Sequence, residues 1–499
     1  MSVLTGQALE TIPPTGFIAM FRLPLFIALV LFHCSSLSAQ ESAEGGKAPE
    51  KVPEGHSNHG EAFNEGPRQS AYLMRGTGNV VFPVATENEK AQAFINQGVG
   101  QLHGFWYFEA ERSFRQAAAL DPKLAISYWG MAMANPNNEK RARDFIAEAV
   151  KLKEGASERG RLYIDALKKF MDAGAKEGKK GDREKKRRQD YLKALDRIIQ
   201  KYPEDLEARA FLVCHTWQSS WRGVPITSHV AMDSLIEQIL QKSPMHPVHH
   251  YRIHLWDNEK PERALPAAAR SGQASPSIAH MWHMGGHIFS KLKRYNDAAW
   301  QQEASARVDH AQMIKDLVLP DQIHNFAHNN EWLIRNLMNV GRVSEASSLA
   351  RNMIELPRHP KYNTLSKGGS SAKYGRRRLF EVLYRYELWG QLVELSRTRY
   401  LSPTELEEEQ VKRLRHLGVA YVRRQDTENG ISVLIDLRDR LDEIERQSGR
   451  TAQRAKDAER KKIEGERSGK KEGKGKEGKE SAELSDAEKK RIQEAGKKA

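Results

Sequence analysis

The sequence predicts an all-α fold, a solenoid built from antiparallel helix pairs. A unit of about 34 residues recurs along the chain, and the alternating patterns typical of strands are almost absent. In the clearest unit, small residues fall at Gly285, Gly286 and Ala298, where the helices of a pair need them. One period earlier, Ala264 occupies the place of Ala298. Each pair is expected to bury its apolar face against the neighbouring pairs.

The residues of this unit follow the tetratricopeptide repeat (TPR) pattern. Trp282, Gly285 and Phe289 fit its first helix, and Ala298 fits its second helix. The chain therefore resembles TPR proteins, and the expected fold is a TPR-like α-solenoid. The stretches INQGVGQLHGFWYFEAERSFRQAAALDP and AHMWHMGGHIF are also similar to a family of exported bacterial TPR proteins, over about residues 76–357. That resemblance implies the fold and export of the chain, but it does not indicate a biochemical activity.

The beginning of the chain predicts export. Residues 1–39 are expected to be a signal peptide, because the apolar run LPLFIALVLF follows Arg22 and precedes small residues. The run is short for a membrane span. Met20 would give a more ordinary signal than the 19 further residues before it, so we expect it to be the true start. The polar segment 40–75 is expected to be a linker. The mature chain should be periplasmic or extracellular, with no transmembrane span.

The helical repeats are expected over residues 76–441, as six to eight hairpins with a basic insertion near 174–188. Residues 442–499 form a Lys/Glu/Gly-rich tail, and roughly half of the net charge of +14 lies after about Arg446. Neither charged segment has enough apolar surface to offset the entropy of ordering, so both are expected to lack fixed contacts and the tail to be disordered. No aromatic residues are interleaved with the charges, so specific nucleic-acid binding is not expected. Nothing in the pattern sets an oligomeric state.

The chain has only two cysteines, Cys34 and Cys214. Cys34 lies in or beside the segment expected to be removed, and His33 is a poor residue before a lipidated cysteine. The mature chain therefore has no internal disulfide. Its stability must come from packing.

Two adjacent copies of the repeat carry histidine at matching places. The first helices of TPR-like pairs line a concave groove, and their second, fifth and ninth places face inward. The residues expected to line a ligand groove are His246, His249, His280, His283, His287, His328, Glu331 and Arg335. Imidazoles on this face could bind the carboxylate or backbone of a peptide or partner protein.

A second pattern predicts a metal site. Pairs of histidines four residues apart lie on one face of a helix, and the expected ligands are His250, His254, His283, His287, His324 and His328. Two imidazoles one turn apart can hold one ion, with a third ligand from the neighbouring helix. Imidazole favours zinc or another divalent transition metal. No HExxH motif is present, so a zincin protease is not expected, and no catalytic residue is assigned.

Two functions stay open on the sequence. The first is an exported scaffold that binds a peptide or partner protein through a histidine-lined concave groove, without being an enzyme. The second is a metal-binding protein or metal-dependent enzyme that uses the same histidines. Stoichiometric metal that survives dialysis would distinguish the second from the first.

Overall fold

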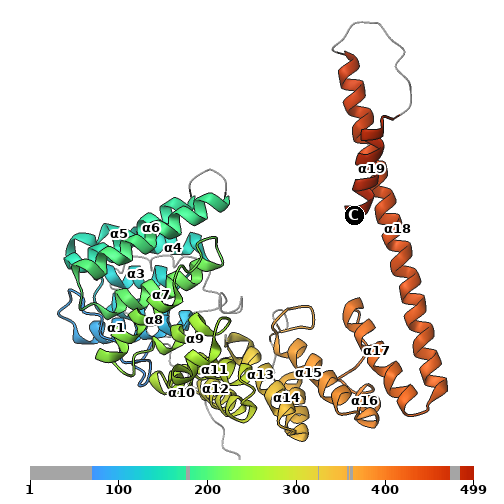
Figure 1. Cartoon of the computed structure of the whole chain (residues 1–499), viewed down its shortest axis with the longest axis horizontal. Helices are drawn as coiled ribbons and strands as arrows, with labels where there is room; N and C mark the ends of the chain where they lie inside the picture. Colours follow the sequence, from blue (N-terminus) through green and yellow to red (C-terminus); the bar gives the residue numbers. More distant parts are fainter. Residues whose placement is uncertain are drawn as a thin grey trace, which may run out of the picture. The chain divides into compact units, whose positions relative to one another are not determined.

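The computed structural model describes residues 70–175, 180–323, 325–356, 359, 363–472 and 484–498. Within these ranges every regular element is a helix (Figure 1), which confirms the predicted all-α class. Consecutive helices pack against one another, and the loops inside the pairs are short, so the two helices of a pair run antiparallel. None of the described helices combines the length and the apolar character that a membrane crossing requires.

The first seven helices share one apolar core. The helices of the N-terminal half are α1 Glu89–His103, α2 Tyr107–Leu120, α3 Ala125–Met133, α4 Glu139–Lys151, α5 Glu158–Ala175, α6 Lys180–Lys201, α7 Leu206–Ser220 and α8 His229–Lys242, with a 3-10 turn at Lys153–Gly155. Phe114 of α2 is fully buried. A Cβ atom added at Gly98 would lie 2.7 Å from the Phe114 ring, and one added at Gly130 would lie 2.4 Å from it. The two glycines therefore let α1 and α3 approach this ring.

The middle helices carry the repeats that the sequence pattern identified most clearly. They are α9 His249–Trp256, α10 Leu265–Ala274, α11 Ala279–Lys291, α12 Tyr295–Asp316, α13 Phe326–Asn339 and α14 Val343–Glu355, with 3-10 turns at Pro261–Ala264 and Pro320–Gln322. Ala264 and Ala298 are both fully buried, as the repeat pattern predicted. A Cβ atom at Gly285 would lie 2.7 Å from the carbonyl oxygen of Ala268. The small residues of the pattern thus lie where helices cross closely.

The C-terminal helices have their own core. They are α15 Ser371–Arg385, α16 Trp389–Leu395, α17 Glu407–Arg423, α18 Thr427–Glu472 and α19 Asp486–Lys498. Leu379, Leu383, Leu392 and Leu401 are fully buried in it. The TPR-like arrangement of helix pairs therefore continues beyond the clearest repeats, up to the pair formed by α17 and the first part of α18.

Both charged segments contain helix in their described parts. The basic insertion continues into α6, where Arg187 forms ion pairs with Glu139 and Glu184. In the tail, α18 packs against α19, and Ile463 and Ile492 are 1 % and 7 % exposed. Lys, Arg and Glu are good helix formers, so charged sequence can still extend a helix. The segment expected to be a signal peptide and most of the expected linker lie outside the described residues.

Candidate metal centre

The structure gathers six of the predicted histidines into two clusters on α9, α11 and α13. We call them the first triad, which is His250, His254 and His280, and the second triad, which is His283, His287 and His328. In each triad the three histidines offer ring nitrogens that all lie within 4.8 Å of one another. Three imidazoles at this separation can turn toward one ion.

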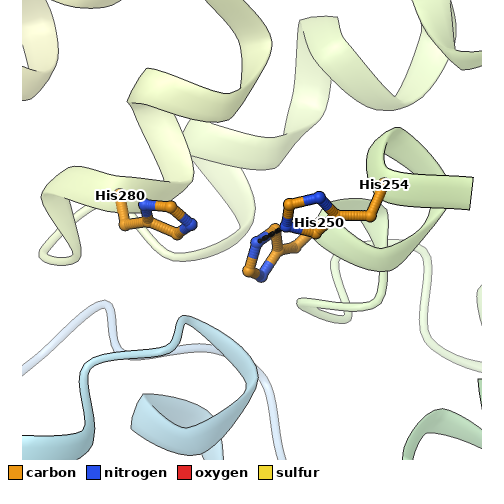
Figure 2. Close-up of side chains that lie close together, drawn as sticks. All are labelled: His250, His254 and His280. Carbon is orange, nitrogen blue, oxygen red and sulfur yellow. Dashed lines mark hydrogen bonds between the residues drawn. The ribbon is translucent and has the colours of Figure 1, made fainter. Parts of the chain in front are cut away.

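In the first triad the three imidazole rings face one another (Figure 2). His250 and His254 lie one turn apart on α9, and their Nε2 atoms are 2.9 Å apart. The ring of His280, from α11, has its centroid 4.9 Å from that of His250. Two helices that are separate in the chain thus supply one cluster.

A backbone group sets the orientation of His250. Its Nδ1–H donates a 2.6 Å hydrogen bond to the carbonyl oxygen of His103, at the end of α1. With the proton on Nδ1, the lone pair of the neutral ring is on Nε2, which faces His254. Carbonyl acceptors orient metal-binding imidazoles in this way. The His254 ring stacks on Trp217 of α7, with the ring centroids 4.0 Å apart.

The second triad has the same construction with different partners. Nδ1 of His283 lies 2.6 Å from the side-chain oxygen of Gln302 and 3.2 Å from that of Asn329. Both oxygens accept hydrogen bonds, so the Nδ1 position carries the proton. Nε2 of His283 then faces Nε2 of His287 at 2.8 Å. The third ring, His328 of α13, has its centroid 4.8 Å from that of His283.

The i+4 histidine of the second triad also stacks on a tryptophan. The rings of His287 and Trp332 are nearly parallel, with their centroids 4.3 Å apart. Each triad therefore contains an imidazole oriented through Nδ1, an imidazole one turn later that stacks on a tryptophan, and a third imidazole from a separate position. The recurrence of all three features makes an accidental cluster a poor explanation.

The two triads repeat at a spacing of 33 residues, since 283 minus 250 and 287 minus 254 both equal 33. A period of 34 residues, which relates Ala264 to Ala298, would instead align His249 with His283. In the structure His249 lies outside both triads, with its Nε2 atom 2.9 Å from the carbonyl oxygen of Pro244. His249 is the first residue of α9, and its side chain contacts the preceding turn. His250, the next residue, therefore lies on the face of α9 that is directed at α11.

Burial keeps these imidazoles neutral. Burial lowers the pKa of His250 to about 4, although the hydrogen bond to the His103 carbonyl raises it. Burial and the neighbouring His328 lower the pKa of His287 to about 3. The pKa values of His254 and His283 are well below the ordinary value, because both rings are buried among other imidazoles. At neutral pH the rings carry no net charge, so they can bind a cation without a net loss of protons. Nε2 of His254 and of His287 is the donor in the two Nε2–Nε2 contacts, so each of these rings must first move its proton to Nδ1.

The two triads are neighbours. His280 of the first and His283 of the second lie on the same helix, with their ring centroids 5.8 Å apart. His250 and His283 are fully buried, whereas His254, His280, His287 and His328 are partly exposed. Each triad therefore has a protected side and a side from which an ion can enter.

A third cluster, His103, Glu207 and His246, is fully buried and is already hydrogen-bonded within itself. Nδ1 of His246 accepts the backbone N–H of Val248 at 3.0 Å, so its Nε2–H points at Glu207, 3.1 Å away. His103 contacts Glu207 through Nε2 at 2.5 Å and the Tyr251 hydroxyl through Nδ1 at 2.8 Å. Burial raises the pKa of Glu207, but the two facing imidazoles bring it well below its usual range. This cluster is a hydrogen-bond network in which each ring nitrogen already has a protein partner.

The other predicted site residues have different surroundings. Glu331 forms ion pairs with Arg377 and Arg378. The guanidinium of Arg335 lies 4.6 Å from the centroid of the Trp332 ring, beside the second triad. His246 belongs to the buried network described above. His324, expected as a metal ligand, lies outside the described residues.

Several residues that shape the site were not predicted from the sequence. They are His103, Glu207, Trp217, Gln302, Asn329 and Trp332. For Trp332 a signal was present, because it follows His328 by four residues and so lies on the same helix face. Trp217 and Gln302 gave no such signal, since they reach the histidines from other helices.

Comparison with known proteins gives only weak likenesses. Neither a family model nor a curated protein matches the chain. Among solved structures, the chain is similar to the APC/C hetero-tetramer Cut9–Hcn1, at 12 % identity and a TM-score of 0.26. The match covers 70 % of this chain and 66 % of that chain, so it spans just under two thirds of the matched protein. It is also similar to the P58(IPK) TPR domain, at 13 % identity and a TM-score of 0.17, covering 71 % and 97 %. It is similar to yeast Tom70 as well, at 10 % identity and a TM-score of 0.24, covering 71 % of this chain and 85 % of that one. Because these TM-scores are low, the assignment of a TPR-like architecture rests on the helix pairs of this chain.

Proposed function

We propose that the protein binds first-row transition metal ions, one at each histidine triad. The observation that carries this proposal is the construction that occurs twice, an Nδ1-anchored imidazole facing a second imidazole one turn later and a third nearby. In a tetrahedral zinc site with Zn–N bonds of about 2.0–2.1 Å, ligand nitrogens are about 3.3 Å apart. The Nε2 pairs at 2.9 and 2.8 Å need to separate only slightly to admit an ion.

The ligand set restricts the kind of metal. Each triad offers three imidazole nitrogens with no carboxylate or thiolate among its members, which favours zinc, copper or nickel over magnesium or calcium. Three protein ligands leave a fourth position for water or another molecule, as in metal sites that exchange ligands. A metal-dependent reaction is compatible with this arrangement, and a storage or carrier role is equally compatible.

Metal stoichiometry in single-site variants tests the proposal. The purified mature chain is loaded with Zn²⁺, dialysed and measured by elemental analysis, and we expect about two zinc ions per chain. His254→Ala should remove one ion, His287→Ala the other, and the double variant both. The matched control is His310→Ala, because His310 is an exposed histidine outside the triads. A double variant that keeps the wild-type zinc content while remaining folded would show the proposal to be wrong.

Cobalt gives a readout that does not depend on stoichiometry. Co²⁺ bound by three imidazoles and one water should show the intense visible absorption of a tetrahedral complex. We expect this band in the wild type, about half of it in His254→Ala, and none in the double variant. A weak octahedral spectrum in the wild type would contradict a four-coordinate site with one open position.

Partner binding is a second candidate function, and a different surface supports it. His246, His249, His250 and His283 have exposed fractions of 2 % or less, so they do not offer a surface to a peptide. An apolar groove instead lies between α17 and α18, and its lining includes Val422 and Leu434, which are 67 % and 57 % exposed. A groove between two helices fits an amphipathic helix of a partner protein.

Site-specific photo-crosslinking tests this second candidate. A photoreactive amino acid at Leu434 should give one discrete adduct in cells, whose cross-linked peptide has an amphipathic helical pattern. The same amino acid at Glu303, a partly exposed position on α12, should give none. Equal adducts at both positions, or no adduct at Leu434, would contradict a specific groove.

Export is also part of the proposal, and it is supported by the apolar run before His33 and the small residues after it. In the source cells, the mature protein should begin near Gln40 and fractionate with exported proteins. A cytoplasmic protein that retains residues 20–39 would contradict export without affecting the metal proposal.

A further inference from the structure

A cavity lies among α1 to α7 and α9, next to the first triad. It has about 90 Å³ of space for the centres of water-sized molecules, enough for several waters or a small organic molecule. Much of its wall is aromatic, including Phe105, Tyr107, Phe170, Tyr191 and Phe211. Two arginines of α6, Arg187 and Arg188, also line it. A mostly apolar cavity with a few polar groups at one place is typical of small-molecule sites.

Two carboxylates hold these arginines in place. Glu184 accepts hydrogen bonds from the Nε atoms of both Arg187 and Arg188, and Glu139, which also lines the cavity, accepts one from Arg187. The ion pairs balance the charge of the two guanidinium groups but do not use all of their N–H donors.

The guanidinium of Arg187 is also incompletely hydrogen-bonded. Arg187 is 7 % exposed, and its buried Nη1 atom has no hydrogen-bond partner among the residues that the structure describes. Leaving a buried charged donor unsatisfied is costly, and a ligand carboxylate would satisfy it. The ring of Phe170 lies 4.5 Å from the Arg187 guanidinium and holds it against the cavity wall.

We propose that this cavity binds a small carboxylate with an apolar or aromatic body. The carboxylate would lie on the Nη atoms of Arg187 and Arg188, and the body would pack against Phe105, Phe170 and Tyr191. The planar guanidinium group suits carboxylate recognition, which a lysine would not reproduce. This inference does not rest on metal binding, although Phe105 also contacts the imidazole of His250, with ring centroids 4.4 Å apart.

Calorimetric titration of the metal-free full chain with benzoate tests the inference. We expect saturable binding of benzoate and at least tenfold weaker binding of benzamide, which has the same shape without the charge. Arg188→Gln should weaken benzoate binding at least tenfold, whereas Arg197→Gln, an exposed arginine on the same helix, should not. Ala132→Leu, which fills the cavity from α3, should abolish binding with the helical content retained.

The test of carboxylate binding is independent of the test of metal binding. His254→Ala should bind benzoate as the wild type does, because His254 contributes no charge to this cavity. No binding of either benzoate or hexanoate to the wild type would overturn the inference. Equal binding of benzoate and benzamide, or unchanged binding in folded Arg188→Gln, would overturn it as well.

Discussion

The Nδ1–H of His250 donates a 2.6 Å hydrogen bond to the carbonyl oxygen of His103, 147 residues earlier in the chain. His103 is the last residue of α1, and its own ring belongs to the buried network with Glu207 and His246. The network therefore fixes the carbonyl that orients the first triad. Two histidine clusters that differ in chemistry are linked through one backbone group.

The orientation of His283 should depend on Gln302. Gln302→Leu removes the closer oxygen acceptor at His283 Nδ1, so the ring can rotate or change tautomer. Loss of such a partner typically lowers metal affinity about 10–100-fold. Competition titration with a chelator should show this loss for one of two zinc ions, while Gln302→Glu, which keeps an oxygen acceptor, retains the site. Equal affinity in the leucine variant would show that the contact is not functional.

The stability of the metal-free protein should fall steeply below neutral pH. Burial, with a smaller effect of Arg188, lowers the pKa of His215 to about 3 in the folded state. In the unfolded chain histidine titrates near about 6.5. The unfolded state therefore takes up protons first, and stability is lost as the pH falls from about 6.5 toward about 3.

Between pH 6 and 5, His215→Phe should make the free energy of unfolding fall less steeply with decreasing pH, by about 1 kcal/mol per pH unit. Urea unfolding at several pH values measures it. His310→Gln, at an exposed histidine, is the control and should leave the slope unchanged. If the two variants had the same pH dependence, His215 would not be neutral and buried as the structure places it.

Asp309 should have the opposite pH dependence. Burial raises its pKa to about 8, although a hydrogen bond from Asn325 lowers it. Because the folded pKa is above the unfolded value of about 4, the folded state is progressively penalised as the pH rises from about 4 to about 8. Asp309→Asn imitates the neutral acid without that penalty.

We expect Asp309→Asn to raise the free energy of unfolding by on the order of 5 kcal/mol at pH 8 and by little at pH 4. Asp439→Asn, on an exposed position of α18, is the control and should change neither value. Chemical denaturation at the two pH values measures the difference. A stabilisation that is the same at both would contradict a titrating Asp309.

Gly98 should not tolerate a side chain. The added Cβ of Gly98→Ala would overlap the buried Phe114 ring, and overpacking of this kind costs about 1–3 kcal/mol. Phe114→Leu in the same chain should recover part of the loss, because it makes room for the methyl group. Gly155→Ala is the control, since its Cβ would meet only one atom at 4.0 Å. Thermal unfolding of the four chains should show the loss for Gly98→Ala and the partial recovery.

The repeat period predicted the architecture because close helix crossings require small residues, and these can be recognised in the sequence. Gly285, Ala264 and Ala298 are small wherever one helix must approach another, and such positions recur with the repeat. The same local logic gave the histidine pairs four residues apart, since a helix places them on one face whatever surrounds it. These features depend only on the geometry of a single helix or hairpin.

The charged segments show the limit of composition. Their lack of apolar residues predicted no fixed contacts, yet α18 packs against α19, and Ile463 and Ile492 on these helices are buried. Composition counts residues over a segment, whereas burial depends on which few of them meet. In the described part of the tail, one apolar side chain on each helix is buried where α18 and α19 pack together.

Spacing along the chain was enough to predict the helix pairs, the small residues between them and six histidines able to act in pairs. Helix packing places His280 beside His250 and leaves His249 out, because this depends on how α9 and α11 cross. It also decided the partners Trp217 and Gln302, which come from other helices. Spacing along a helix fixes which side chains share a face. The packing of helices fixes what that face meets, and no local pattern in the chain carries that information.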